Sequence, residues 1–203
     1  MKDKYEQVEV ASRAEWRAWI AANHRQPMPI WLVTYKKSAG DRYLPYNAIV
    51  EEALCFGWID SLPRKLDDAR TMVLLSPRKS GSSWSAANRD RVDRLIADGL
   101  MAAAGLAVVS AARADGSWDR LKEPETGNPP PDLAAALAAA GAGQGFAALS
   151  LATRKRCLEF LSMARRGETR AARIAKIVAG AQAGTDPLAW RRKAPDQPTD
   201  AMR

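Results

Sequence analysis

Segments with the pattern of a β-strand all lie before residue 78, and after that point the patterns are helical. The clearest strand is 30–36 (IWLVTYK), a run of β-branched and aromatic residues. The other predicted strands are 7–11, 58–66 and 71–76, and the helices predicted to pack on them are 12–24, 45–57 and 86–98. We therefore expect an α+β fold, in which a small, mostly antiparallel sheet packed by helices is followed by a C-terminal helical subdomain.

Particular residues indicate how these elements begin and which way they face. Ser12 and Glu15 have the spacing of a capping box, which predicts a helix start. Pro63 cannot donate a backbone hydrogen bond, so its strand is predicted to be an edge strand or to carry a bulge. In the helix at 45–57 the apolar stripe predicts that Glu51 and Glu52 point away from the core.

A proline run divides the chain. Pro129, Pro130 and Pro131 end a polar segment that we interpret as a linker. The predicted parts are 1–115 as the α+β core, 116–131 as the linker, 132–184 as a basic helical subdomain and 185–203 as a tail expected to be frayed. Within the subdomain we expect helices at 132–140, 150–166 and 168–182, with a flexible break between the first two.

No segment is expected to cross a membrane. Residues 133–153 carry no charge over 21 residues, a sufficient length, but glycines interrupt the run and Gln144 lies near its centre. The first ten residues have no apolar run behind their lysines, so no secretory signal is expected. Cys55 and Cys157 lie in apolar helical patterns and are predicted to be reduced, buried and unpaired, which favours a cytoplasmic location.

The positive charge is concentrated near the C-terminus. The chain carries a net charge of +8, and residues 150–193 hold 11 basic and 3 acidic side chains. The basic surface predicted on the helical hairpin consists of Arg154, Lys155, Arg170, Arg173 and Lys176. The simplest interpretation is a solvated face, and the alternative is contact with nucleic acid or an anionic membrane surface. Helix-turn-helix spacing, an aromatic platform and zinc-finger spacing are missing, which disfavours nucleic acid.

Familiar catalytic and cofactor motifs are also missing from the sequence. His24 is the single histidine, and no phosphate-binding glycine loop, dinucleotide fingerprint or Cys-x-x-Cys pair is present. His24, Cys55 and Cys157 lack the short spacing of metal ligands, so we predict no metal site and no cofactor.

One stretch, residues 54–91, combines the polar and aromatic groups of a possible ligand site. Short connections should bring its side chains into one concavity. The predicted ligand-binding residues are Trp58, Asp60, Ser61, Arg64, Arg78, Trp84, Ser85 and Asn88. A carboxylate, two guanidinium groups and a helix N-terminus can bind a polar or anionic ligand, with tryptophan as a stacking wall. The alternative is structural, with Asp60 paired to an arginine, Ser85 as a helix cap and the tryptophans in the core.

The strings ALCFGWIDS, SPRKSGSSWSAANRDRV and ARRGETRAARIAKIV resemble successive blocks of the bacterial YdeI/OmpD-associated (OmdA, "bacteriocin-protection") family. The resemblance extends from about Trp16 to Val178. It implies a small cytosolic bacterial protein linked to tolerance of bacteriocins and cationic antimicrobial peptides, and to an outer-membrane porin. It implies no catalytic residues.

Three functional hypotheses follow. The first is a stress or antimicrobial-protection protein that binds or sequesters a small-molecule or cationic-peptide ligand. The second is an enzyme that uses Asp60 and Ser61 with Arg64 and Arg78. The third is a nucleic-acid or anionic-surface binder acting through the basic hairpin. The oligomeric state is left open by the sequence.

Overall fold

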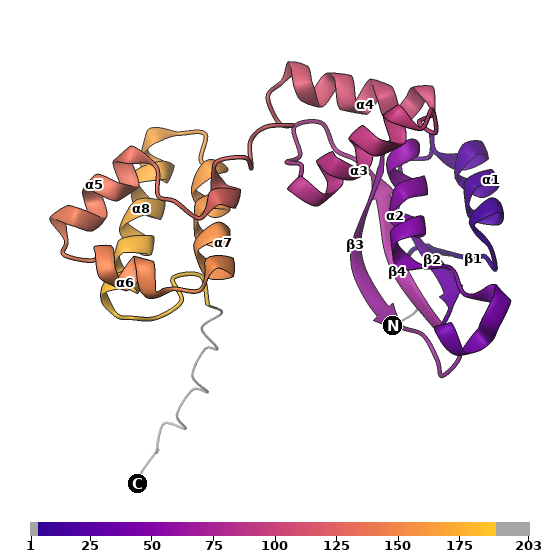
Figure 1. Cartoon of the computed structure of the whole chain (residues 1–203), viewed down its shortest axis with the longest axis horizontal. Coiled ribbons are helices and arrows are strands. Elements are labelled where there is room, and N and C mark those ends of the chain that lie inside the picture. Colours follow the sequence, from indigo (N-terminus) through magenta and orange to yellow (C-terminus); the bar gives the residue numbers. More distant parts are fainter. Residues whose placement is uncertain (1–3, 190–203) are drawn as a thin grey trace, which may run out of the picture. The chain divides into compact units, whose positions relative to one another are not determined.

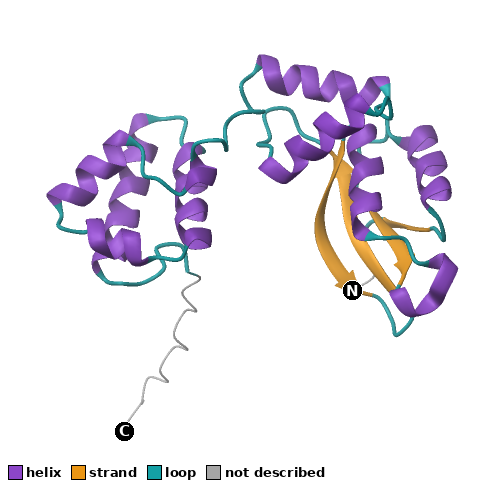
Figure 2. Ribbon diagram, in the orientation of Figure 1, coloured by secondary structure: helices purple, strands orange, loops and turns teal. Residues whose placement is uncertain are grey.

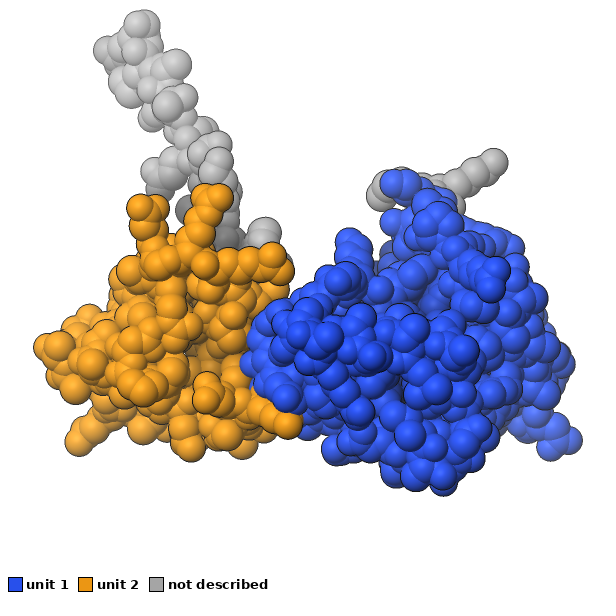
Figure 3. Space-filling model, turned by 90° about the horizontal axis from the view of Figure 1, so that it is seen from above, with its two compact units in different colours: residues 1–121 blue, residues 122–203 orange. Residues whose placement is uncertain are grey.

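The computed structural model describes residues 4–189 and divides the chain into two compact units, residues 1–121 and 122–203 (Figure 3). Unit 1 contains β1 (Glu6–Glu9), α1 (Arg13–Asn23), β2 (Ile30–Tyr35), η1 (Lys37–Arg42), α2 (Tyr46–Cys55), β3 (Trp58–Lys65), β4 (Arg70–Pro77), α3 (Ala86–Ala97) and α4 (Ala103–Ala114). Unit 2 contains η2 (Pro124–Thr126), α5 (Pro131–Ala139), α6 (Gly143–Ala148), α7 (Leu151–Ser162) and α8 (Gly167–Gln182) (Figure 1). The α+β class predicted from the sequence is confirmed.

The sheet of unit 1 has the strand order β1-β2-β4-β3, with β1 parallel to β2 and the other pairs antiparallel. Helices cover one face of the sheet (Figure 2). The core there includes Trp16, Ile49 and Val92 from the helices and Leu32 and Leu75 from the strands. Side chains alternate along each strand, so the opposite face carries a second, smaller cluster. That cluster consists of Trp31, Val33 and Met72.

The edge strand β3 has the irregularity that its proline predicts. Its pairing with β4 shifts register between Asp60 and Pro63, and β3 is the last strand of the sheet. Both features offered as alternatives by the sequence, an edge position and a bulge, are therefore present together. Leu62 lies within the irregular part and is exposed.

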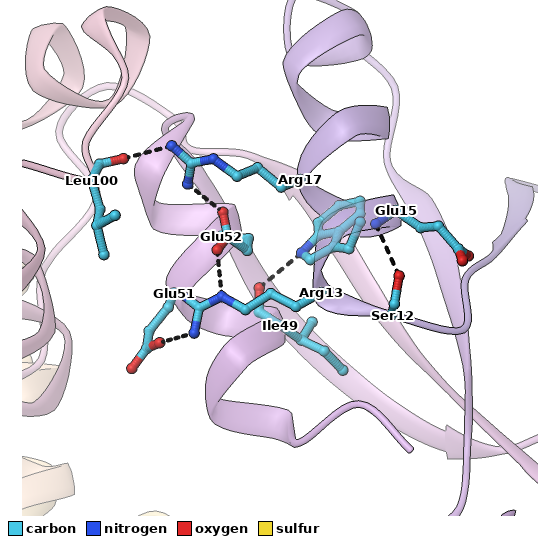
Figure 4. A network of polar contacts seen from close by, with 9 residues as sticks. Ser12, Arg13, Glu15, Arg17, Ile49, Glu51, Glu52 and Leu100 are labelled. Carbon is cyan, nitrogen blue, oxygen red and sulfur yellow. Dashed lines mark hydrogen bonds and ion pairs between the residues drawn. The ribbon is translucent and has the colours of Figure 1, made fainter. Parts of the chain in front are cut away.

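A polar network joins α1 to α2 and corrects one prediction (Figure 4). Glu52 is only 2% exposed, although its position was expected to face away from the core. Its carboxylate accepts hydrogen bonds from Arg13 Nε and Arg17 Nη1, each at 2.6 Å. Arg17 also donates to the carbonyl oxygen of Leu100 at 2.9 Å. The apolar stripe did not reveal this position because its two cationic partners come from a different helix.

The start of α1 follows its capping signal closely. Ser12 Oγ accepts a hydrogen bond from the Glu15 amide at 3.2 Å, as a helix N-cap does. Glu15 reaches back to the amide of Ala11, one residue before the N-cap, at 2.9 Å. This variant of the capping box fixes the end of α1 that carries Arg13 and Arg17.

Unit 2 has its own hydrophobic core, in which Leu133, Phe146, Leu161 and Ile177 are buried. One prediction for this unit is wrong, because α6 occupies part of the segment expected to be a flexible break. Gly145 makes this possible. A Cβ atom there would lie 2.0 Å from the carbonyl oxygen of Ala181, so only glycine lets α6 approach α8 this closely.

The boundary between the units falls between Leu121 and Lys122, within the segment interpreted as a linker. Trp118 and Leu121 in this segment are buried. Of the tail expected at 185–203, the structure describes 185–189, where Leu188 packs on the core of unit 2. The remainder of that prediction lies outside the described residues.

Candidate functional site

Two glycines bring α4 against the turn between α2 and β3. Gly57 has φ +77°, which L-residues rarely adopt, and a Cβ there would lie 2.8 Å from Val108 Cγ2. Gly105 packs on the backbone of Cys55, where a Cβ would lie 2.3 Å from the carbonyl oxygen. The amide of Ala102 donates to the same carbonyl at 3.1 Å. These contacts position the start of α4 beside the start of β3 and the end of β4.

A cavity of about 550 Å³, here called the arginine cavity, opens at this junction. Its lining comes from the end of α1, the α2–β3 turn, the end of β4 and the start of α4, and includes His24, Arg25, Phe56, Trp58, Arg78 and Val108. Most of the lining is apolar, and the charged groups are the two arginines. This volume falls within the range of about 300–1,000 Å³ that is usual for small-molecule sites.

Arg78 is the unusual residue of this cavity. Its guanidinium lies 3.6 Å from the centre of the Trp84 ring, and its Nη2 donates to the carbonyl oxygen of Ser83 at 2.7 Å. Its Nε is buried and has no hydrogen-bond partner. Burial lowers the pKa of Arg78 to about 10, and the negative charge of Asp60 offsets only part of this effect. Within residues 4–189 Arg78 forms no ion pair, so its charge is partly desolvated without a neighbouring carboxylate in contact.

Arg25 differs from Arg78 in its surroundings. It lies just after α1, is exposed, and forms no hydrogen bond or ion pair with any residue that the structure describes. The neighbouring His24 contacts the Phe56 ring, with 5.6 Å between the ring centres. Arg25 is not among the residues predicted for the site, because only the folding of α1 onto the sheet brings it near Arg78.

The two tryptophans of the predicted site are buried, each 1% exposed. Trp58 Nε1 donates to the carbonyl oxygen of His24 at 2.9 Å, which fixes one wall of the arginine cavity. Trp84 supports Arg78 and lines a second, smaller cavity with it. Trp58 and Arg78 are thus brought together in one cavity, and Arg78 and Trp84 in the next.

Asp60 and Asn88 lie in a polar cluster at the starts of α2 and α3. Tyr46 Oη donates a hydrogen bond to Asp60 Oδ2. Arg91 donates to Asn88 Oδ1 and to Asn47 Oδ1, both at 3.0 Å. Tyr46, Asn47 and Arg91 were not among the residues predicted for the site, because the sequence assigned them only as parts of helices.

The other three predicted residues have separate local roles. Ser85 is the N-cap of α3 and accepts a hydrogen bond from the Asn88 amide. Ser61 Oγ donates to the carbonyl oxygen of Leu74 at 3.2 Å. Arg64 lies over the Trp31 ring, 4.6 Å from its centre, and Trp31 belongs to the cluster on the other face of the sheet.

The predicted basic surface of unit 2 is partly engaged within the unit. Arg170 binds Asp132 through Nε and Nη2, at 2.5 Å and 2.9 Å. Arg173 donates to the carbonyl oxygen of Phe160 and lies over its ring. The remaining members are Arg154, whose Nε is buried and unbonded, Lys155, and Lys176, which lies over the Phe160 ring.

Two family models match the chain. Residues 8–108 match a domain of unknown function, DUF8412. Residues 128–184 match the OmdA model, described as "Bacteriocin-protection, YdeI or OmpD-Associated". The family suspected from the sequence is therefore confirmed for residues 128–184. A search of the curated proteins and a search of the solved structures each found no match.

The arginine cavity and the three resembling strings fall in different family matches. All residues that line the arginine cavity lie within the first match. The strings ALCFGWIDS and SPRKSGSSWSAANRDRV also lie there, and only the third string falls within the OmdA match. Among the helices that the structure describes, none combines the length and apolar character that crossing a bilayer requires.

Proposed function

We propose that unit 1 binds a small anion with an apolar part in the arginine cavity, and that this binding serves a protective role against bacteriocins or similar compounds. The protective role is suggested by the description of the family that residues 128–184 match. The binding role rests on unit 1 alone.

The observation that carries the proposal is the state of Arg78. A partly buried cation without an ion-pair partner lowers stability, because it has lost water and gained no opposite charge. An anion in the cavity would supply that charge, and charge-assisted contacts of this kind are among the stronger polar interactions. A loss of folding stability of this kind is typical of binding sites, where a residue is placed to contact a ligand and does not stabilise the fold.

The other residues that line the arginine cavity indicate the chemical character of the rest of the ligand. Phe56, Trp58 and Val108 present apolar surface beside Arg78, and Arg25 places a second positive charge at the cavity. This combination favours a ligand with one acidic group and an apolar body. It disfavours a cationic peptide in this cavity, since both charged side chains would repel it.

The structure favours binding over the catalytic alternative. Ser61 uses its hydroxyl to bond Leu74 within the sheet, and Asp60 accepts from Tyr46. Arg64 stacks on Trp31 in the cluster of the opposite face. The side chains of the proposed catalytic set are thus engaged with three different neighbours.

Calorimetric titration with decanoate as the probe tests the proposal. The intact protein should bind it, and Arg78→Met should weaken binding roughly tenfold or more, the equivalent of one charge-assisted hydrogen bond. Arg64→Met is the matched control, because Arg64 also stacks on a tryptophan but lies outside the cavity. The absence of binding by the intact protein, or equal binding by Arg78→Met, would overturn the proposal.

A cellular experiment tests the protective role separately. A bacterial strain that lacks this protein should be more sensitive to bacteriocin, and reintroducing the intact chain should restore growth. A chain with Arg78→Met, produced at the same level, should fail to restore it. Full restoration of growth by that variant would show that protection does not depend on the arginine cavity.

A further inference from the structure

A second cavity of about 120 Å³, here called the serine cavity, lies beside the arginine cavity and shares Arg78 and Val108 with it. Its polar lining comes mainly from the loop between β4 and α3, with Lys79, Ser80 and Ser82, and from Ser117. The serine cavity is too small for a whole ligand of ordinary size. Its place next to the arginine cavity suits the head group of a ligand whose apolar body lies there.

The loop that forms the serine cavity is held in one conformation. Gly81 adopts φ +70°, and its carbonyl oxygen accepts from Arg120 Nη1 at 2.5 Å. Ser82 Oγ donates to the carbonyl oxygen of Lys79 at 2.7 Å, which closes a tight turn. The backbone of this loop is therefore held in one conformation before any ligand arrives, a condition that lowers the entropic cost of binding.

Several donors at this cavity have no use within the fold. The Nε of Arg78 is buried and unbonded. Lys79 and Ser80 are exposed, and the Lys79 ammonium and the Ser80 hydroxyl form no hydrogen bond with any residue that the structure describes. Two cations and a hydroxyl thus border one small space without a common acceptor.

The one carboxylate at the cavity, Asp115, is already occupied. It accepts from the amide of Ser117 at 2.8 Å, and hydrogen bonding from Ser117 holds the pKa of Asp115 below its ordinary value. The Asp115 carboxylate is therefore hydrogen-bonded to the backbone around the cavity. Arg78 and Lys79 leave the lining with a net positive charge.

We propose that the acidic group of the ligand is a phosphate monoester, seated in the serine cavity; this rests on the proposed function of the arginine cavity. A phosphate carries about −1.5 to −2 charges at neutral pH and three acceptor oxygens. It can accept from Arg78, Lys79 and Ser80 at once, which a planar carboxylate with two oxygens does less completely. The structure therefore favours an amphipathic phosphate over a fatty acid.

Decyl phosphate and decanoate, which share one alkyl chain, separate the two head groups in calorimetric titrations. The intact protein should bind decyl phosphate roughly tenfold more tightly, the value of one additional charge-assisted contact. Lys79→Gln should remove most of this preference, because it should weaken the binding of decyl phosphate more than that of decanoate. Lys37→Gln, which changes a lysine outside both cavities, should keep the preference.

The outcomes distinguish the two proposals. Equal affinity of the intact protein for both probes, or an unchanged preference in Lys79→Gln, would overturn the phosphate assignment while the arginine cavity remains a binding site. If neither probe binds, both proposals fail. Inorganic phosphate should compete with decyl phosphate, and a lack of competition would place the head group elsewhere.

Discussion

Burial changes the acid–base behaviour of several single side chains among the described residues, and three of these show it most clearly. It raises the pKa of Tyr46 to about 12, together with the hydrogen bond and charge of Asp60, and it raises the pKa of Cys157 to about 11. It lowers the pKa of Arg78 to about 10. Each group therefore keeps its ordinary proton at neutral pH, but only Arg78 is left charged in a desolvated position.

The two cysteines are buried and unpaired, as predicted from the sequence. Burial raises the pKa of both thiols, so little of the reactive thiolate forms. We expect a bulky disulfide reagent at pH 8 to label them roughly a hundredfold more slowly in the folded protein than in urea. Rapid labelling of either thiol without denaturant would contradict this prediction.

Gly105 is a position where a single methyl group should be harmful. Alanine would favour the helix by about 1 kcal/mol, but its Cβ would lie 2.3 Å from the Cys55 carbonyl oxygen. We expect the clash to dominate and Gly105→Ala to lower the free energy of unfolding by about 1–3 kcal/mol in urea titrations. Gly167→Ala, where no atom lies within 4 Å of the new Cβ, is the control and should be neutral or stabilising.

At the scale of elements, charge and not only apolar contact joins α1 to α2. Glu52 is almost fully buried, whereas the side chains of Arg13 and Arg17 are 42% and 37% exposed. The two ends of the network therefore have different access to water. Removing the acid leaves two arginines that water can reach, but removing the arginines leaves a carboxylate that water cannot reach.

This asymmetry gives a prediction. Replacing Arg13 and Arg17 together with methionine should lower the free energy of unfolding by about 3 kcal/mol, the scale for an unpaired buried charge. Glu52→Gln should cost less, because an amide can still accept from the arginines. Denaturant titrations of the two variants test the order, and an equal or larger loss for Glu52→Gln would contradict it.

Unit 2 should lose stability at both ends of the pH range. Asp132 and Asp186 have pKa values below their ordinary value, chiefly through hydrogen bonds from Arg170 and Arg156. Their contribution is complete above the unfolded pKa of 3.8 and disappears as the pH falls through the lower folded values. Cys157 acts in the opposite direction, since its stabilising protonated state is lost between pH 9 and about 11.

Variants separate these contributions. Asp132→Asn should be less stable than the intact chain near pH 6, and the two should converge below the folded pKa of Asp132. Cys157→Ala should reduce the loss between pH 9 and 11. Unfolding followed by circular dichroism across the pH range provides the measurement, and a constant difference between Asp132→Asn and the intact chain would contradict the assignment.

On the scale of the whole molecule, each unit has a hydrophobic core of its own. We expect residues 1–121 to fold alone and to bind the amphipathic probes with the affinity of the full chain, because every residue of both cavities lies within this range. Circular dichroism and titration of the fragment test this. An unfolded fragment, or a folded one that does not bind, would contradict the prediction.

The sequence predicted the four strands and the helices α1, α2 and α3 because their local signals are strong. The run from Ile30 to Tyr35 and the caps at Ser12 and Ser85 each depend on neighbouring residues. Features that depend on distant contacts were hidden from the sequence. Arg25 reaches the cavity only through packing, and α6 needs the close approach that Gly145 allows.

The candidate site was predictable only in part, for the same reason. Short connections placed Arg78 near Trp58 and Trp84 correctly in one region. They did not show that Arg64 turns to the opposite face of the sheet, because the register shift in β3 changes the alternation of side chains.

The irregular edge of β3 also bears on how this protein behaves when it is concentrated. An open sheet edge is a template on which another chain can add a strand. The exposed apolar side chain of Leu62 favours such an association at this edge. Pro63 offers no amide hydrogen, and the register shift beside it interrupts the row of backbone groups that an added strand would need. Replacing this proline would therefore open a route to fibrillar aggregation that the native sequence blocks.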